Sequence, residues 1–347
     1  MKIGILTGGG DCPGLNAVIR AVVRKGITAY GDEVFGILEG WKGLLKGQTE
    51  RLDLNKVSGI LHRGGTIIKT SRTNPYKEEN GEKVIIQQLQ KLGLDAIIAV
   101  GGEDTLGVAS RLHQAGVKVV GVPKTIDNDV SGTDYSFGFD TAVNIAMEAI
   151  DRLHSTAESH NRVIVVEVMG RHAGWIAVHS GIAAGADVIL IPEKPVDLDQ
   201  VCQVIKKRHD RGRDFSLVVV AEGAKITSEQ DKDGRIVVQR RELDQFGHVR
   251  LGGIGQVLAE EIEKRTGYEA RYVILGYIQR GGSPTAFDRV LGTRFGIAAI
   301  DLVHRGEFGK VVCLRGNSIL SMPIADAIGK PKLVDQELFN VAQAFFG

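Results

Sequence analysis

The sequence predicts an α/β protein of two lobes, each a doubly wound and mostly parallel sheet. Three observations lead to this prediction. The chain has 347 residues, which is long for one hydrophobic core. Short apolar runs alternate with segments of helical periodicity along the chain. Glycine-rich turns follow several of the apolar runs, as is typical where a parallel strand passes into a helix.

The first lobe is expected to span residues 1–138 plus about 279–329. Its expected strands are residues 2–7, 34–38, 96–100 and 117–122, and its expected helices are residues 15–27, 83–91 and 106–112. Glycines mark the ends of two of these helices, Gly31 after the first and Gly93 after the second. The helix that follows Asp288 is expected to return the chain to this lobe.

The second lobe is expected to span residues 139–278 plus about 330–347. A long helix over residues 141–157 opens it, and strands are expected at 162–168, 186–193, 217–221 and 270–276. Residues 227–250 are highly polar and are expected to form a surface insertion. Asp233-Gly234 within this stretch is a hairpin-turn signal.

Composition excludes several classes of function. Hydrophobic content of 43% and charged content of 24% are ordinary for a globular protein. A net charge of +1 favours neither nucleic acid nor a membrane surface, and 5% aromatic residues make a base-stacking platform unlikely. The three cysteines (Cys12, Cys202 and Cys313) lack metal-ligand spacing and suit a reducing compartment. The chain enters a strand at once, without a signal peptide or membrane span, so we expect a cytoplasmic protein.

Four paired or tripled glycines follow expected strands: Gly8–Gly10, Gly64-Gly65, Gly101-Gly102 and Gly281-Gly282. Such turns let backbone N–H groups approach an anion, and the start of a following helix adds partial positive charge. Each turn alone is explained equally well by a tight turn that needs positive φ. Together they indicate a ligand rich in phosphate.

Acidic residues concentrate in two short turns, Glu103 and Asp104 in one and Asp127 and Asp129 in the other. Carboxylates at loop tips suit Mg²⁺ shared with substrate phosphates, and in phosphoryl transfer an acid can take the proton of the attacking hydroxyl. The alternative for Asp127 and Asp129 is turn capping through side-chain hydrogen bonds. Lys124 just before them favours a site.

Five arginines stand at or beside expected strand ends: Arg72, Arg162, Arg171, Arg271 and Arg280. The guanidinium fork matches phosphate oxygens in pairs. Five such residues in a chain with no net basic charge indicate binding of phosphorylated substrates. The histidines show no metal-ligand spacing.

Five ordered motifs together resemble the 6-phosphofructokinase family. They are Gly-Gly-Asp-Cys-Pro-Gly-Leu-Asn (9–16), Gly-Gly-Glu-Asp-Thr (101–105), Pro-Lys-Thr-Ile-Asp-Asn-Asp (123–129), Met-Gly-Arg (169–171) and Ile-Gln-Arg-Gly-Gly-Ser-Pro (278–284). The resemblance implies two α/β lobes with the active site in the cleft between them. It also implies transfer of a phosphoryl group to the 1-hydroxyl of fructose 6-phosphate in a Mg²⁺-dependent reaction.

The resemblance implies a role for each matching residue. Asp127 would be the general base, with Thr125 and Asp129 beside it. Glu103 would take the metal position, where the family usually has Asp. Arg171 would stabilise charge on the transferring group. The phosphoryl donor would be contacted by Gly10, Gly102 and Arg72, together with Asp104 and Lys124.

The same resemblance places the sugar phosphate. Besides Thr125, Asp127 and Arg171, the residues implied to bind it are Met169, Gly170, Glu222, Tyr277 and Arg280; Tyr277 stands where bacterial ATP enzymes commonly carry His. Arg162 and Arg271 resemble arginines that reach the 6-phosphate from a neighbouring subunit. We therefore expect a homodimer or homotetramer.

Asp104 and Lys124 predict the donor. The family's ATP-using members typically have Gly at both positions. A carboxylate at 104 would occupy and repel the place of a nucleotide's α-phosphate, at about 1 to 4 kcal/mol for like charges a few ångström apart. Lys124 would offset charge on a compact donor and on the leaving phosphate. Some relatives keep the Lys and use ATP, so Asp104 carries the prediction of pyrophosphate.

Three functions remain open from the sequence. The first is a reversible, pyrophosphate-dependent fructose 6-phosphate 1-phosphotransferase of glycolysis or gluconeogenesis, and the second is an ATP-dependent 6-phosphofructokinase. The third is a non-catalytic sensor of sugar phosphates, against which the intact Asp127, Asp129 and Arg171 argue.

Overall fold

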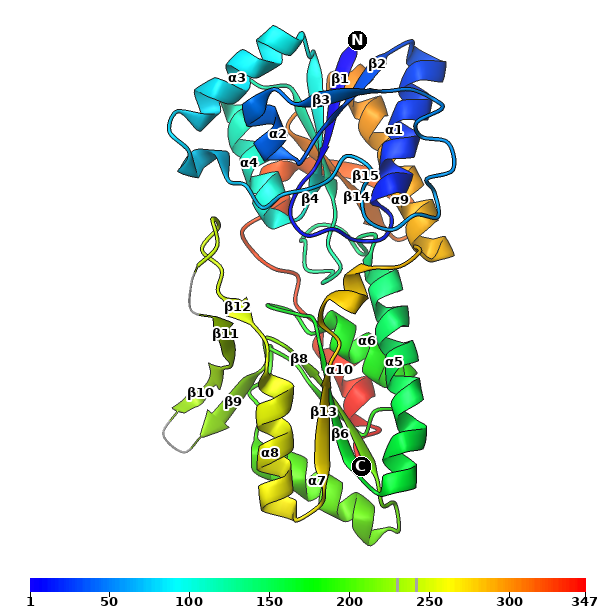
Figure 1. Ribbon diagram of the computed structural model, residues 1–347, viewed down its shortest axis with the longest axis vertical. Coiled ribbons are helices and arrows are strands. Elements are labelled where there is room, and N and C mark those ends of the chain that lie inside the picture. Colours follow the sequence, from blue (N-terminus) through cyan, green and yellow to red (C-terminus); the bar gives the residue numbers. More distant parts are fainter. Residues whose placement is uncertain (229–230, 241–242) are drawn as a thin grey trace. The chain divides into compact units, whose positions relative to one another are not determined.

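The computed structural model of the chain describes residues 1–228, 231–240 and 243–347. Within these residues the chain divides into two compact units (Figure 1). Unit 1 comprises Met1–Thr141 and Arg280–Pro331, and unit 2 comprises Ala142–Gln279 and Lys332–Gly347. Across the described ranges, no helix has the length and apolar character needed to cross a lipid bilayer.

Unit 1 is built on a sheet whose described strands follow the order β15-β14-β5-β4-β1-β2-β3. Their bounds are β1 Lys2–Thr7, β2 Glu33–Ile37, β3 Thr49–Leu52, β4 Ala96–Gly101, β5 Val119–Pro123, β14 Lys310–Arg315 and β15 Ser318–Pro323. The inner pairs are parallel, while β3 and β15 pair antiparallel at the two edges. Because β1, β4 and β5 are parallel neighbours, the turns that follow them lie at one edge of the sheet.

Helices cover both faces of this sheet. Figure 1 shows α1 and α9 side by side on one side of it, with α2, α3 and α4 on the other. The bounds are α1 Leu15–Tyr30, α2 Trp41–Lys46, α3 Gly81–Leu92, α4 Glu103–Gln114 and α9 Ala286–His304, with short 3₁₀ helices η1 Pro75–Lys77 and η3 Ile324–Ala327. Strands β4 and β5 are buried at every position, as expected for central parallel strands covered on both faces.

Unit 2 has a parallel sheet whose described strands follow the order β13-β6-β8-β7. The bounds are β6 Val163–Val168, β7 Val188–Leu190, β8 Ser216–Ala221 and β13 Ala270–Ile274. The helices are α5 Phe139–His160, whose first turn belongs to unit 1, α6 Trp175–Ala183, α7 Leu198–Asp210, α8 Ile254–Thr266 and α10 Gln336–Gln343; η2 Gly276–Arg280 follows β13. The apolar faces of α7 and α8 pack on alternate residues of β6 and β8. The α/β class with mostly parallel sheets is confirmed in both units.

The polar stretch 227–250 contains two small antiparallel sheets. They pair β9 Lys225–Ser228 with β10 Asp231–Ile236, and β11 Val238–Arg240 with β12 Arg250–Leu251. The expected hairpin turn at Asp233-Gly234 is wrong, because both residues lie inside β10. The register shifts between Asp231 and Arg235, so the positive φ of 81° at Gly234 serves a bulge. Residues 229–230 and 241–242 of the expected insertion lie outside the described residues.

Candidate active site

The first glycine turn of unit 1 is packed tightly against its neighbours. Gly9 has a φ of 79°, which favours glycine. A Cβ on Gly8 would lie 2.5 Å from Thr105 Oγ1, and one on Gly10 would lie 2.8 Å from Arg280 Nη1. The N–H groups of Gly8 and Gly9 donate to backbone carbonyls within unit 1, so these two are not available to an anion as the sequence suggested. The turn instead brings side chains close together.

Lys124 is the most deeply buried cation at this turn. It follows β5, is 4% exposed, and its Nζ donates to the carbonyl of Gly10. The pKa of Lys124 is lowered to about 8, mainly by burial and in part by the positive charges of the nearby Arg280 and Arg72. Arg280 Nη1 also donates to Asp11 O at 3.3 Å. Three cationic side chains therefore surround the first glycine turn, an arrangement suited to a polyanion.

Arg280 lies in unit 1 beside Gly10, in the stretch from about residue 279 that was expected to belong to the first lobe. The sugar-binding role that the resemblance implies for Arg280 stays a prediction. The turn Gly281-Gly282 that follows it also packs in unit 1. A Cβ on Gly64 would lie 2.2 Å from Gly282 O, so these two glycines allow backbone to meet backbone. The expectation that Gly64-Gly65 follows a strand is wrong, since residues 53–74 contain no strand.

The two acids after β4 lie on a helix rather than in a preceding turn. We expected the helix to begin at Leu106, but α4 begins at Glu103, with Gly102 as its N-cap. Glu103 and Asp104 both stand in its first turn, where carboxylates interact favourably with the unpaired N–H groups and the helix dipole. Glu103 is exposed and its Oε1 accepts from Gly329 N at 2.9 Å, while Asp104 is half-buried.

Thr125 organises the second acidic turn. Its Oγ1 accepts from Asp127 N at 3.0 Å and donates to Asp129 Oδ1 at 3.1 Å. Asn128, at a φ of 52°, makes a further bond of the turn by accepting from Ser136 N at 3.1 Å. These hydrogen bonds already stabilise the turn, so the side chain of Asp127 is not needed to cap it. Its Oδ1 is buried and has no hydrogen-bond partner among the described residues, so this oxygen can accept a proton or a ligand.

Carboxylates crowd together around this turn. The pKa of Asp129 is raised to about 7, mainly by burial and in part by the negative charges of Asp127 and Glu103. No group of three or more His, Cys, Asp or Glu side chains among the described residues forms a metal cage. Mg²⁺ commonly uses one or two carboxylates and completes its shell with water and substrate phosphates. The exposed Glu103, whose charge acts on the nearby Asp129, fits such a partial donor set.

In unit 2, three parallel strands bring the expected sugar-binding residues to one edge of the sheet. Met169, Gly170 and Arg171 follow β6, Glu222 follows β8, and Tyr277 lies on η2 after β13. Gly223 joins two of these turns: its N–H donates to Gly170 O at 3.0 Å, and a Cβ on it would lie 2.0 Å from Arg171 O. Tyr277 is 66% exposed.

Arg162 and Arg271 do not join this group. Arg162 precedes β6 and Arg271 lies at the start of β13, so both stand at the opposite ends of the strands. A six-residue strand is about 20 Å long. Glu269 lies between the two arginines: it pairs with Arg162 at 2.8 Å and also with Arg271. Within unit 2, this pair faces a different region from Met169 and Arg171.

Two residues that shape these turns were given no role from the sequence, Thr105 and Glu269. Thr105 fills the space beside Gly8, and Glu269 holds the two arginines. A small polar residue after Glu-Asp is too common to single out, whereas Glu269 had a signal, because it stands two residues before Arg271. The fully buried Gln279, within the stretch Tyr277 to Arg280 that the resemblance assigns to the sugar site, accepts from Met169 N at 3.2 Å.

The comparisons with known proteins agree with this geometry. The family model described as Phosphofructokinase matches residues 2–303. The chain belongs to the phosphofructokinase family. The resemblance inferred from the five motifs is thereby confirmed.

Relatives of this phosphofructokinase-family chain differ in the donor that their names state. A pyrophosphate–fructose 6-phosphate 1-phosphotransferase of Streptomyces coelicolor is 60% identical over 348 residues, covering 100% of both chains. ATP-dependent 6-phosphofructokinase 3 of the same organism is 52% identical over 99% of both. Among solved structures, Pichia pastoris phosphofructokinase in the T-state has a TM-score of 0.83 and 33% identity. That match covers 99% of this chain and 36% of the Pichia chain.

Proposed function

We propose that this chain transfers a phosphoryl group from pyrophosphate to the 1-hydroxyl of fructose 6-phosphate. The products are fructose 1,6-bisphosphate and phosphate, and the reaction is reversible because the bonds broken and formed are similar in energy. The observation that carries the choice of donor is Asp104 in the first turn of α4. Greater identity to a pyrophosphate-named relative than to an ATP-named one supports the same choice.

The donor side belongs to unit 1. Lys124, Arg72 and Arg280 would bind the pyrophosphate oxygens, with Gly10 and Gly102 keeping the approach free of side chains. Asp104 would exclude a longer donor, because its carboxylate repels the additional phosphate of a nucleotide. Protonated Lys124 would also stabilise the charge that develops on the leaving phosphate.

Asp127 is the proposed general base. The hydroxyl oxygen attacks phosphorus in line, the bond to the leaving phosphate breaks, and the proton passes to Asp127. Thr125 holds the backbone N–H of Asp127, and the buried, unpartnered Oδ1 is the oxygen that can take the proton. Bound Mg²⁺, held by Glu103 and donor phosphates, would neutralise charge on the phosphoryl group. Asp129 completes the acidic turn beside the metal position.

The acceptor side belongs to unit 2. Met169, Gly170, Glu222 and Tyr277 would bind the sugar, and Arg171 would stabilise the transferring phosphoryl group. The backbone N–H of Gly223, which donates to Gly170 O, and the side-chain oxygen of Gln279, which accepts from Met169 N, hold the Met169–Arg171 loop for this purpose.

Arg162 and Arg271 are proposed to act across a subunit interface in a homodimer or homotetramer. There they would bind the 6-phosphate of the fructose 6-phosphate held by the neighbouring subunit. Their place at the far ends of β6 and β13 supports this, since they cannot share a ligand with Met169 of the same unit. The exposed apolar side chains of Tyr272 (44%) and Ile274 (46%) on β13, an edge strand in the described sheet, fit a covered surface in an oligomer.

A coupled assay with pyrophosphate and with ATP tests the proposal. We expect turnover of fructose 6-phosphate with pyrophosphate and Mg²⁺, and little with ATP. The Asp127→Ser variant should bind fructose 6-phosphate but lose turnover. Turnover with ATP and none with pyrophosphate would favour the ATP-dependent alternative. Binding without turnover in the parent protein would indicate a sensor.

A further inference from the structure

Glu167 is a buried carboxylate that the proposed reaction leaves unused. It lies on β6 and is 2% exposed. Its oxygens accept from Gly253 N at 3.1 Å and from Gly255 N at 2.8 Å. Burial raises the pKa of Glu167, and the backbone N–H groups of Gly253 and Gly255 oppose the effect. Among the residues that the structure describes, no cation pairs with this buried carboxylate; burying a charge in this way is costly, so its position calls for an explanation.

The backbone segment that Glu167 holds is continuous with the segment that contacts Arg171. Gly252 and Gly253, with φ of 135° and 96°, turn the backbone between β12 and α8. Shortly before this turn, Val249 O accepts from Arg171 Nη1 at 2.9 Å. Glu167 lies on β6, and Arg171 follows the end of the same strand. The hydrogen bonds of Glu167 and Arg171, together with the backbone that connects them, therefore form a closed ring within unit 2.

We propose that Glu167 is a positioning residue for phosphoryl transfer. By fixing the start of α8, it fixes the carbonyl of Val249, and this carbonyl holds the guanidinium of Arg171 in one orientation. The inference rests on the proposed function, which assigns Arg171 to the charge of the transferring group. It also assigns a role in positioning Arg171 to Val249, near the end of the polar stretch 227–250.

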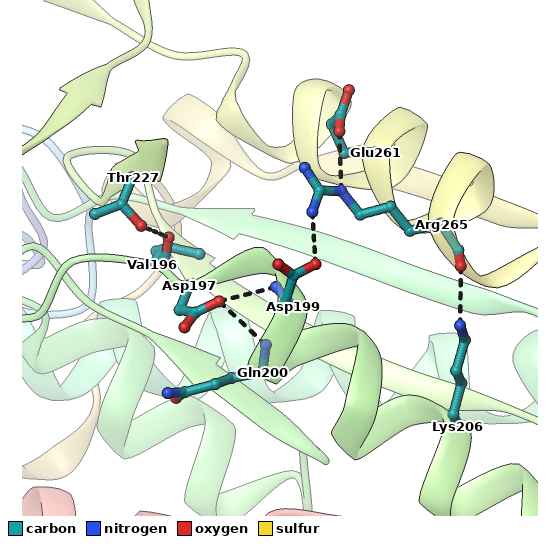
Figure 2. A network of polar contacts seen from close by, with 8 residues as sticks. All are labelled: Val196, Asp197, Asp199, Gln200, Lys206, Thr227, Glu261 and Arg265. Carbon is teal, nitrogen blue, oxygen red and sulfur yellow. Dashed lines mark hydrogen bonds and ion pairs between the residues drawn. The ribbon is translucent and has the colours of Figure 1, made fainter. Parts of the chain in front are cut away.

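The simpler explanation is that Glu167 only stabilises a helix N-terminus. Asp197 provides the matched comparison within unit 2. Figure 2 shows its side chain accepting from Asp199 N at 2.9 Å and Gln200 N at 3.2 Å at the start of α7. Both carboxylates therefore bind N–H groups at a helix start, but only the segment held by Glu167 contains the carbonyl that binds Arg171.

Steady-state kinetics of three single variants provide the first test of the proposal. Glu167→Gln puts an amide NH₂ against backbone donors, so we expect kcat with pyrophosphate to fall about ten- to one-hundredfold. The KM for pyrophosphate should change little. Glu167→Asp keeps the carboxylate and should recover part of kcat. Asp197→Ala should lower the midpoint of thermal unfolding but leave kcat unchanged.

The double variant of Glu167→Gln with Arg171→Ala gives the decisive readout. If Glu167 acts through Arg171, the first change should cost nothing further once the arginine is gone. If the double variant instead loses kcat by the product of the two single losses, the positioning role is overturned while the proposed function stands. The same holds if Glu167→Gln keeps a normal kcat and only its thermal midpoint falls. Should Glu167→Gln not fold, Glu167→Asp decides: a parental kcat overturns the role, and a reduced kcat in a folded protein supports it. A parent enzyme inactive with either donor would overturn both proposals.

Discussion

The side chain of Thr105 lies against both Gly8 and Gly101, and so fixes the ends of β1 and β4 relative to the start of α4. A Cβ on Gly8 would lie 2.5 Å from Thr105 Oγ1 and 2.8 Å from its Cγ2. A Cβ on Gly101 would lie 2.3 Å from Thr105 Cβ itself. A Cβ at either glycine would meet the same three atoms of Thr105, but the nearest atom is Oγ1 for Gly8 and Cβ for Gly101.

This difference predicts an asymmetric rescue. Gly8→Ala and Gly101→Ala should each destabilise unit 1 by about 1–3 kcal/mol through overpacking. Thr105→Ala removes the atoms nearest to position 8 and leaves a Cβ contact of 3.2 Å, so it should rescue Gly8→Ala. It should not rescue Gly101→Ala, because the Cβ of residue 105 remains. Thermal unfolding of single and double variants measures both effects, and equal rescue of the two glycine variants would contradict the packing described.

Removing the carboxylate of Asp104 should admit ATP. If the carboxylate repels a nucleotide phosphate by about 1 to 4 kcal/mol, Asp104→Gly should raise kcat/KM with ATP by about 5- to 1,000-fold. Asp104→Asn keeps the volume and removes the charge, so it separates repulsion from steric exclusion. Both variants are assayed with each donor, and their thermal midpoints report the loss of a favourable first-turn charge. ATP turnover that stays at zero even in Asp104→Gly with Lys124→Gly would show this explanation to be wrong.

The lowered pKa of Lys124 predicts an alkaline limit to activity. Burial lowers this pKa to about 8, so the charged fraction of the free enzyme falls as the pH rises through about 8. Attraction for pyrophosphate weakens with it, and kcat/KM for pyrophosphate should decline in that range. Arginine at position 124 stays charged at these pH values. In Lys124→Arg, kcat/KM for pyrophosphate should therefore not decline around pH 8, whatever the absolute rate of the variant. A parent profile that is flat through pH 8 would contradict the prediction.

In unit 2, Arg208 should be needed to keep Asp187 stable in its buried position. Arg208 Nη1 pairs with Asp187 Oδ1 at 2.9 Å, and Asp187 Oδ2 accepts from Leu217 N at 2.8 Å. Burial raises the pKa of Asp187, and the Leu217 N–H and Arg208 oppose it. Arg208→Met should lower the free energy of unfolding by roughly 2–3 kcal/mol, because it leaves the carboxylate buried without its cation.

The fluorescence of Trp175 during urea unfolding reports this effect for unit 2. Trp41→Phe removes the other tryptophan, and the buried Trp41 Nε1 has no hydrogen-bond partner in the described structure to lose. Adding Asp187→Asn to Arg208→Met should restore much of the stability, since no charge is then left buried. A single Arg208→Met variant as stable as the parent would rule out this role for the pair.

The features predicted correctly from the sequence were those set by local pattern. Apolar runs placed the central strands, and alternation with helices indicated parallel sheets, because only helical crossovers connect such strands. The acids, Lys124 and the arginines were singled out because charge at the end of a buried strand is costly without a partner or ligand, and their roles in the site stay predictions. Five motifs in order were specific enough to indicate the family.

The remaining features depend on contacts that no local pattern reports. The start of α4 at Glu103 was missed because acidic residues after glycines are typical both of turns and of a first helical turn. Asp233-Gly234 has hairpin chemistry, but pairing with β9 places it in a bulge. Glu167 looked like an ordinary member of a strand, and Thr105 like an ordinary member of a turn. Their partners, Gly253 and Gly8, are far away in sequence, so packing alone reveals them.

Unit 1 is made from two stretches of chain with most of unit 2 between them, and this has a consequence for biosynthesis. The backbone of Gly64 rests against Gly282, and β14 pairs with β5. During translation the first stretch therefore keeps β5 as an unpaired strand edge until β14, at residues 310–315, has left the ribosome. Open edges template aggregation, and closing so long a loop is slow. The nascent chain should thus depend most on chaperones after β5 has been made and before β14 emerges.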